Sequence, residues 1–243
     1  MKSIAVMALL FGLTGCISME PHPTGFTAKQ VETANFSISI WEKNTIQKGQ
    51  PLRLYYEGDG NPNPKHTVAL EYAKQDKSPN VIYIARPCQW SNDKICKQKP
   101  QIYGQDRFHT EIMKEMEELT QYLVRKYQAP KVDLIGYDGG AVMALNMATK
   151  VPSPRVITIA GITDLNTYTY YHDLPEMENA DNPADNLMLL AQIPQIHYVG
   201  GQDTVTPRRL VERFVARMKN PKSAVVKMVP GATHTDWGVK LDY

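Results

Sequence analysis

The sequence has few cysteines, almost no net charge and no internal repeat. The first two of these features limit the ligands and partners that we expect for the protein. Three cysteines supply too few thiols for a zinc site, and the six histidines show no HxxxH or HExxH spacing, so we expect no metal. A formal net charge of +2, from 27 basic and 25 acidic side chains, indicates no particular partner. The short basic stretches at 97–99 and 207–209 are expected on a solvated surface, so no nucleic-acid partner is predicted.

The N-terminal segment predicts export and a lipid anchor. Lys2 precedes an apolar run, Ile4 to Leu13, which is too short to span a bilayer and is followed by Thr14, Gly15 and Cys16. This pattern resembles a bacterial lipoprotein signal. The resemblance implies cleavage after residue 15, lipidation of the Cys16 thiol and attachment to a membrane of the cell envelope, with the protein facing the periplasm. An ordinary cleaved secretory signal is the alternative.

The mature chain is expected to consist of a tether and one domain. Residues 16–34 are rich in Pro, Gly and Thr and are interpreted as the tether. With 42% hydrophobic residues in the whole chain and no low-complexity block, residues 35–243 are long enough for one domain with a sizeable core. Cys88 and Cys96 are left to pair in an oxidising compartment, where their bridge is expected to pin a short polar surface loop rather than to hold the core together.

Hydrophobic periodicity alternates between strands and helices across this domain. Short apolar runs predict strands, and longer segments with an apolar stripe predict helices. The expected strands are 36–41, 52–56, 81–85, 132–136, 156–160, 195–199 and 224–229, and the expected helices are 67–75, 106–127, 141–148 and 208–218. This alternation predicts an α/β fold with a mostly parallel central sheet and helices on both faces. Residues 162–192 are polar and rich in tyrosine, and we interpret them as a small cap.

The most informative segment is Gly136-Tyr137-Asp138-Gly139-Gly140, which lies between a predicted strand and a predicted helix. It has the shape of the G-x-S-x-G elbow, in which a sharp turn pushes the central side chain out above the sheet. Glycines on either side let the strand and the helix approach without Cβ clashes. Asp138 stands where serine is expected, and aspartate tolerates the positive φ of that position. The alternative is that Asp138 only caps the following helix.

Loops after the later strands carry an acid and a histidine in the order that hydrolases with this elbow use. Asp203 follows the strand 195–199, and His234 follows the strand 224–229. His234 can hold its Nδ1–H on Asp203 and offer Nε2 to Asp138. Asp164 is the rival orienting acid, in which case Asp203 only caps the next helix. His197 lies within a strand and is expected in the core.

A second glycine turn, Glu57-Gly58-Asp59-Gly60, follows the strand 52–56 and predicts the donors of an oxyanion hole. The backbone N–H groups of Asp59 and Gly139 are expected to bind the developing charge, with Gly58 in the same turn. A plain turn is the alternative. Prolines follow and no helix opens there, so a phosphate-binding loop is excluded and no cofactor is expected.

Taken in order, these motifs resemble those of lipid-anchored α/β-hydrolase-fold proteins of Gram-negative bacteria. The resemblance covers most of the mature chain and rests on the segments 55–60, 85–90 with Cys96, 136–140, 160–164, 182–185, 200–203 and His234. It implies an α/β-hydrolase-like fold in which Asp203 and His234 serve position 138 at the top of the sheet. Members of this family usually have serine in G-Y-S-G-G, so Asp138 departs from the pattern at the nucleophile.

The aspartate changes the expected chemistry. A carboxylate is ionised at neutral pH and needs no base to become a nucleophile. Its attack on a carboxylic ester gives an anhydride, whereas its attack on a saturated carbon gives an alkyl ester that His234 can hydrolyse through water, as in dehalogenases and epoxide hydrolases with an Asp elbow. We expect a hydrolase of an unidentified small molecule, with Asp138 as nucleophile or in water activation. The alternative is a silent lipoprotein that acts by binding or envelope assembly, its hole filled by Asp138.

Overall fold

The computed structural model describes residues 21–60, 64, 66–91, 93–152, 155–219, 223–238 and 240–241. The expected signal peptide, residues 1–15, and the lipidation site Cys16 lie outside the described residues. Among the helices that are described, none combines the length and the apolar character needed to cross a bilayer.

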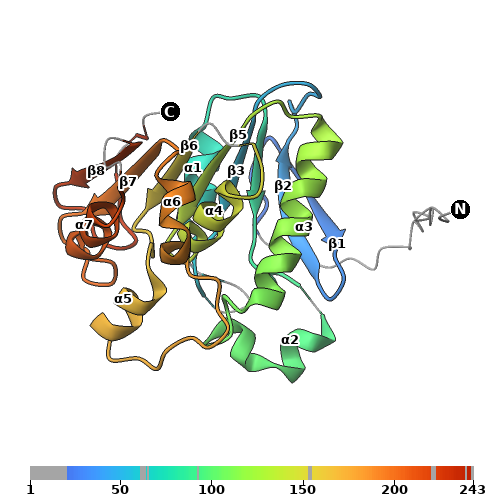
Figure 1. The fold of residues 1–243 in the computed structure, drawn as a ribbon. Coiled ribbons are helices and arrows are strands. Elements are labelled where there is room, and N and C mark those ends of the chain that lie inside the picture. The colour runs from blue at the N-terminus through green and yellow to red at the C-terminus, as the bar shows by residue number, and fades with distance from the viewer. Residues whose placement is uncertain are drawn as a thin grey trace, which may run out of the picture.

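An eight-stranded sheet forms the centre of the domain, in the order β1-β2-β4-β3-β5-β6-β7-β8 (Figure 1). The strands β3 to β8 are parallel, β2 is antiparallel to β4, and β1 is antiparallel to β2. Their bounds are β1 Phe26–Glu32, β2 Ser37–Lys43, β3 Leu52–Tyr56, β4 Val81–Ile84, β5 Val132–Tyr137, β6 Arg155–Ile159, β7 Gln195–Gly200 and β8 Ala224–Val229. The predicted mostly parallel sheet is confirmed. Its central strands are mostly apolar because helices or loops cover both faces.

Helices cover both faces of this sheet. Hydrophobic residues of α3, α4, α6 and α7 belong to one core cluster, and those of α1 belong to the cluster on the other face, where α1 lies behind the sheet in Figure 1. The helices are α1 Val68–Gln75, α2 Lys94–Gln98, α3 Thr110–Tyr127, α4 Gly140–Ala148, α5 Leu165–Tyr171, α6 Leu187–Leu190 and α7 Arg208–Ala216, with 3-10 turns at Pro100–Tyr103 and Pro183–Asn186.

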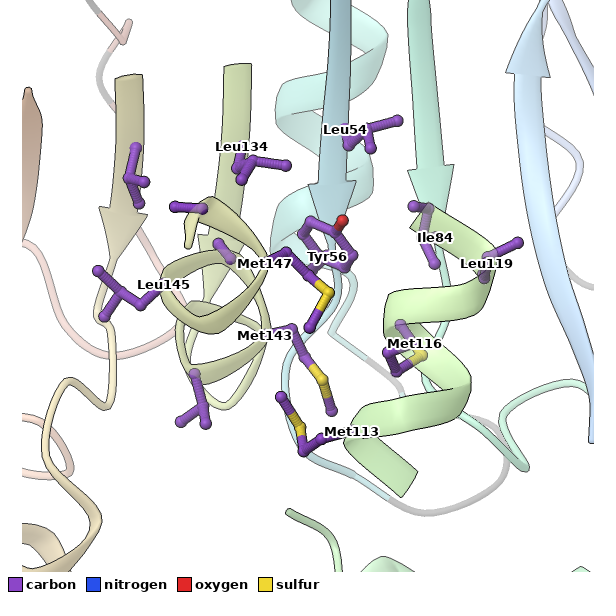
Figure 2. Packing of buried hydrophobic residues seen from close by; sticks show 14 of the residues in the cluster. Leu54, Tyr56, Ile84, Met113, Met116, Leu119, Leu134, Met143, Leu145 and Met147 are labelled. Carbon is purple, nitrogen blue, oxygen red and sulfur yellow. The ribbon is translucent and has the colours of Figure 1, made fainter. Parts of the chain in front are cut away.

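Methionines fill the space between α3, α4 and the sheet. Figure 2 shows Met113 and Met116 of α3 facing Met143 and Met147 of α4, close to Tyr56 at the end of β3. All five side chains are buried. Unbranched, flexible methionine suits such an irregular gap between two helices and a twisted sheet. This packing holds the N-terminus of α4, and therefore the turn before it, against the end of β3.

The expected tether to residue 34 is wrong for residues 26–32, which form β1. This strand pairs along its whole length with β2, from Phe26 opposite Lys43 to Glu32 opposite Ser37. Its side chains are only exposed or half-buried. An edge strand buries little surface, so its composition carries no strong apolar signal. The folded domain thus begins about nine residues earlier than expected.

One part of the segment 162–192 belongs to the main core, and another part lies beyond the carboxyl ends of the strands. Leu190 of α6 is fully buried in the cluster that holds α3 and α4. The helix α5 follows the carboxyl end of β6 and lies below the sheet in Figure 1. Part of the segment that was expected to form a cap is therefore built into the domain itself.

The predicted bridge between Cys88 and Cys96 is present. It closes the loop that contains the start of α2. Both cysteines are buried, and both belong to the main hydrophobic cluster. The bridge therefore anchors this loop to the core. This differs from the expected surface position because the segment 85–90, which contains Cys88, remains buried after β4 ends at Ile84.

Candidate active site

Asp138 occupies a sharp turn between β5 and α4. Its φ of 50° lies in the left-handed region, which aspartate tolerates better than most residues. Its N–H donates to the Ile159 carbonyl at 3.0 Å, and its own carbonyl accepts from Ala141 and Ile162 at 3.1 Å. A Cβ on Gly136 would lie 2.2 Å from the carbonyl oxygen of Gly140, so the elbow glycine is required by close packing. The helix α4 has no side-chain cap, so Asp138 does not serve as one.

Asp138, Asp203 and His234 come together at the carboxyl ends of β5, β7 and β8. The Nδ1 atom of His234 lies 3.0 Å from Oδ2 of Asp203, and its Nε2 lies 3.4 Å from Oδ1 of Asp138. Relative side-chain exposure is 17% for His234, 10% for Asp138 and 0% for Asp203. The arrangement is a chain of acid, imidazole and carboxylate that is largely shielded from water.

Asp203, and not Asp164, orients the imidazole. Asp203 also accepts the backbone N–H groups of Val205 at 2.8 Å and Thr206 at 2.9 Å. Burial alone would raise the pKa of Asp203, but its hydrogen bonds from His234 and Thr206 outweigh this and lower it. Asp164 instead caps α5 and pairs with Arg217.

The turn after β3 presents one of its two predicted donors to Asp138. The Asp59 N–H donates to Oδ2 of Asp138 at 3.0 Å. The Gly58 N–H is directed elsewhere, to Oε1 of Glu57 at 2.9 Å, so Gly58 was wrongly assigned to the hole. A hydrogen bond from Gly139 to a developing oxyanion stays a prediction. At rest, the Asp138 carboxylate itself occupies the position next to the Asp59 donor.

Glu57 explains why Gly58 turns away. Its buried carboxylate accepts from Gly58 and, at 2.9 Å, from the hydroxyl of Tyr83. Burial raises the pKa of Glu57 to about 7, although these hydrogen bonds act in the opposite direction. A buried carboxylate requires such donors, and the adjacent N–H is one of the nearest.

Sequence reasoning missed two arginines beside the elbow. Arg86 and Arg107 both pair with the side chain of Asp59, whose backbone faces Asp138. Arg86 follows the carboxyl end of β4, and the rule that ligand sites form at strand ends was a signal that could have pointed to it. Arg107 precedes α3 and has no comparable signal. Both charges also act on Asp138, because each guanidinium lies within electrostatic reach of that carboxylate.

His234 is the group whose charge this site changes most. Burial alone would lower the pKa of the imidazole, but the hydrogen bonds and charges of Asp138 and Asp203 outweigh burial and raise it to about 9. His234 is therefore an imidazolium at neutral pH. The predicted core histidine, His197, is the opposite case: burial lowers its pKa to about 4, and its Nδ1 lies 2.8 Å from the Thr158 hydroxyl.

Asp138→Asn is expected to lower the pKa of His234 from about 9 toward the ordinary value of 6.5. The pKa of His234 is higher in the folded protein than in the unfolded chain, so its ion pairs with Asp138 and Asp203 stabilise the fold fully below about pH 6.5. This contribution, at most ~3 kcal/mol, is lost as the pH rises through 9. NMR titration of the imidazole and urea unfolding at several pH values measure both effects. An unchanged His234 pKa in the variant would show that Asp138 does not hold the proton there.

No cluster of three or more His, Cys, Asp or Glu side chains suited to a metal ion occurs in the described part of the chain. The polar groups around Asp138 are instead paired with one another. The site brings together a carboxylate, an imidazole and a backbone N–H.

No protein-family model and no curated protein sequence matches this chain. Solved structures do resemble it. They include the esterase Pf2001 of Pyrococcus furiosus (14% identity, 90% of this chain and 84% of that chain, TM-score 0.58) and an alpha-beta serine hydrolase homologue from Coxiella burnetii (14%, 86% and 89%, TM-score 0.59). Est1E from Butyrivibrio proteoclasticus is a third (13%, 86% and 90%, TM-score 0.60). The chain therefore has an α/β-hydrolase-like fold.

Proposed function

We propose that this protein is a hydrolase in which Asp138 is the nucleophile, His234 the base and Asp203 the residue that orients His234. The observation that carries the proposal is the different environment of the two Asp138 oxygens. Oδ2 accepts the Asp59 N–H at 3.0 Å, while Oδ1 faces His234 at 3.4 Å. One oxygen is thus held in the position of an oxyanion, and the other is directed toward the base.

The two oxygens suit the two steps of a covalent hydrolysis. In the first step, Oδ1 attacks a saturated carbon, and the bond to the leaving group breaks with its electron pair on that group. Asp138 becomes an uncharged alkyl ester, with Oδ2 as its carbonyl oxygen. Since the Asp138 charge no longer supports the imidazolium, the pKa of His234 falls, and the imidazole releases its proton to the leaving group or to water.

In the second step, neutral His234 takes a proton from water as the water oxygen attacks Cγ of Asp138. Negative charge develops on Oδ2, where the Asp59 N–H already points. The bond between Cγ and Oδ1 then breaks, and the alcohol leaves with the proton from His234. For a haloalkane, the balance is one water consumed, one alcohol formed and one halide released with a proton. For an epoxide, the ring oxygen is the leaving group and stays attached, so one water is consumed and one diol is formed. The same carboxylate would give an anhydride from a carboxylic ester, so alkyl electrophiles such as epoxides and haloalkanes are the favoured class.

Turnover in H₂¹⁸O tests this proposal. Epoxides and haloalkanes are screened first, and an active substrate is then turned over many times in labelled water. If water attacks Cγ, the label enters the Asp138 carboxylate and the peptide that contains it becomes heavier. Label that appears only in the product would mean that water attacks the substrate directly, with Asp138 or His234 as base, and would overturn the nucleophile assignment.

A binding protein without catalytic activity is the second candidate, and the occupied oxyanion-donor position at Asp59 favours it. The Asp138 carboxylate occupies the donor position at rest and is 10% exposed. A site closed in this way could persist without turnover, since a fold does not imply a function. Absence of any adduct or turnover across the electrophile panel supports this candidate.

We also propose that the mature protein is held in the bacterial envelope by a lipid on Cys16. The support is the sequence pattern before that cysteine. Cys16→Ser is expected to abolish lipidation and to move the protein from the membrane to the soluble fraction on cell fractionation. Membrane partition that is unaffected by the substitution would count against the anchor.

A further inference from the structure

Two arginines hold the side chain of the residue whose backbone faces Asp138. Nη1 of Arg86 donates to Oδ1 of Asp59, and Nε of Arg107 donates to Oδ2. The three side chains are 7%, 12% and 20% exposed, in the order Arg86, Arg107 and Asp59. Each oxygen of a single carboxylate is therefore bound by a different guanidinium, from segments 27 and 48 residues away in the chain.

The arginines are themselves fixed. Nη2 of Arg86 donates to the carbonyl of Arg107 at 2.5 Å, and Nη1 of Arg107 donates to the carbonyl of Gly104 at 2.8 Å. Both guanidinium groups lie over the ring of Phe108, at 4.7 and 5.0 Å from its centroid. The Asp59 carboxylate is consequently held by a rigid frame and not by mobile surface side chains.

This frame has an electrostatic cost. Burial lowers the pKa of Arg86 to about 9, and the neighbouring charge of Arg107 acts in the same direction. Buried ion pairs contribute little net stability, because desolvation offsets their attraction. The cluster lies against the elbow, since a Cβ on Gly139 would be 1.9 Å from Oδ1 of Asp59 and 2.9 Å from Nη1 of Arg86. A costly cluster in this place points to a role in the site.

Resting on the hydrolase function proposed above, we propose that Arg86 and Arg107 are positioning residues that direct the Asp59 N–H at Oδ2 of Asp138. The Asp59 N–H lies in a glycine-flanked turn in which Gly60 adopts φ 152°, and its peptide group is held on the Gly58 side by Gln89, whose Nε2 donates to the Gly58 carbonyl at 3.2 Å. The two arginines clamp the Asp59 carboxylate at both oxygens and so fix the other side of this peptide group. The arginines thereby act on the second step, in which charge develops on Oδ2, through Asp59 and without contacting the substrate.

Amide hydrogen exchange of Asp59 tests the positioning directly and needs no substrate. Arg107→Gln removes one arm of the frame, and Arg107→Lys keeps the charge and serves if the glutamine variant does not fold. The control is Arg155→Gln, which breaks an Arg–Asp pair with Asp133 at the opposite ends of the strands. We expect the Asp59 N–H to exchange at least ~10-fold faster in Arg107→Gln, less so in Arg107→Lys, and at the wild-type rate in the control. Wild-type protection in Arg107→Gln, or in Arg107→Lys if only that variant folds, would overturn the proposal.

The kinetic readout separates positioning from a general structural defect. With an active alkyl electrophile, Arg107→Gln is expected to alkylate Asp138 at nearly the wild-type rate but to hydrolyse the ester about 10²-fold more slowly, as for the loss of an oxyanion donor. Equal slowing of both steps would overturn the role in positioning. If no electrophile alkylates even the wild type, the proposed hydrolase fails, and the exchange of the Asp59 amide still decides whether the arginines direct this N–H.

Discussion

His234→Ala is expected to trap Asp138 as its alkyl ester and to lower turnover of an active alkyl electrophile by about 10²–10⁴. The first step needs only the Asp138 carboxylate, because a carboxylate needs no base to become a nucleophile. The second step needs a base within reach of Cγ, and His234, at 3.4 Å from Oδ1, is the group that supplies it. Intact-mass spectrometry after mixing should show the protein heavier by the alkyl group, in one copy per chain.

The exposed residue His66 offers a matched control for this experiment. His66→Ala should turn over at the wild-type rate and accumulate no adduct. Peptide mapping must place the alkyl group on Asp138. If the wild type turns over but His234→Ala carries no adduct, Asp138 is not the nucleophile, and direct water activation becomes the better mechanism.

Asp138→Ser is expected to produce esterase activity on short p-nitrophenyl esters, about 10²–10³ above the double variant Asp138→Ser/His234→Ala. The serine hydroxyl would take a position near Nε2 of His234, while Asp203 keeps its 3.0 Å contact with Nδ1. Removing the Asp138 charge also lowers the pKa of His234, so the imidazole becomes a base at neutral pH. The Asp59 N–H, released from Oδ2, is then available to the oxyanion of the ester.

Asp138→Asn is the matched control, because it also removes the charge but supplies no nucleophile. It should stay at the level of the double variant in the same assay. Equal rates for the serine and asparagine variants would mean that the three side chains are not arranged for catalysis. Together with the absence of any Asp138 adduct, that result would favour the silent binding protein.

The sequence by itself determined the features that depend on neighbours in the chain. Buried parallel strands are continuous apolar runs, so β3, β4 and β5 were recognisable at nearly their true bounds. The elbow at Asp138 was recognisable because close packing admits only glycine at Gly136. The strand-end position of His234 followed from the order of these elements. Each of these features can be recognised from a short run of consecutive residues, without knowing which other parts of the chain pack against it.

Only the tertiary structure decided which residues of the site are paired by hydrogen bonds and ion pairs. Whether Asp203 or Asp164 faces His234 depends on which loop folds back over the sheet, and both acids follow a strand. The frame around Asp59 consists of Arg86 and Arg107, which lie 27 and 48 positions further along the chain. No sequence periodicity links residues at such separations. The edge strand β1 escaped notice because it buries too little surface to need apolar residues. Long-range contacts between charged groups are set by where the packed core brings the strand ends, and that position is a property of the whole fold.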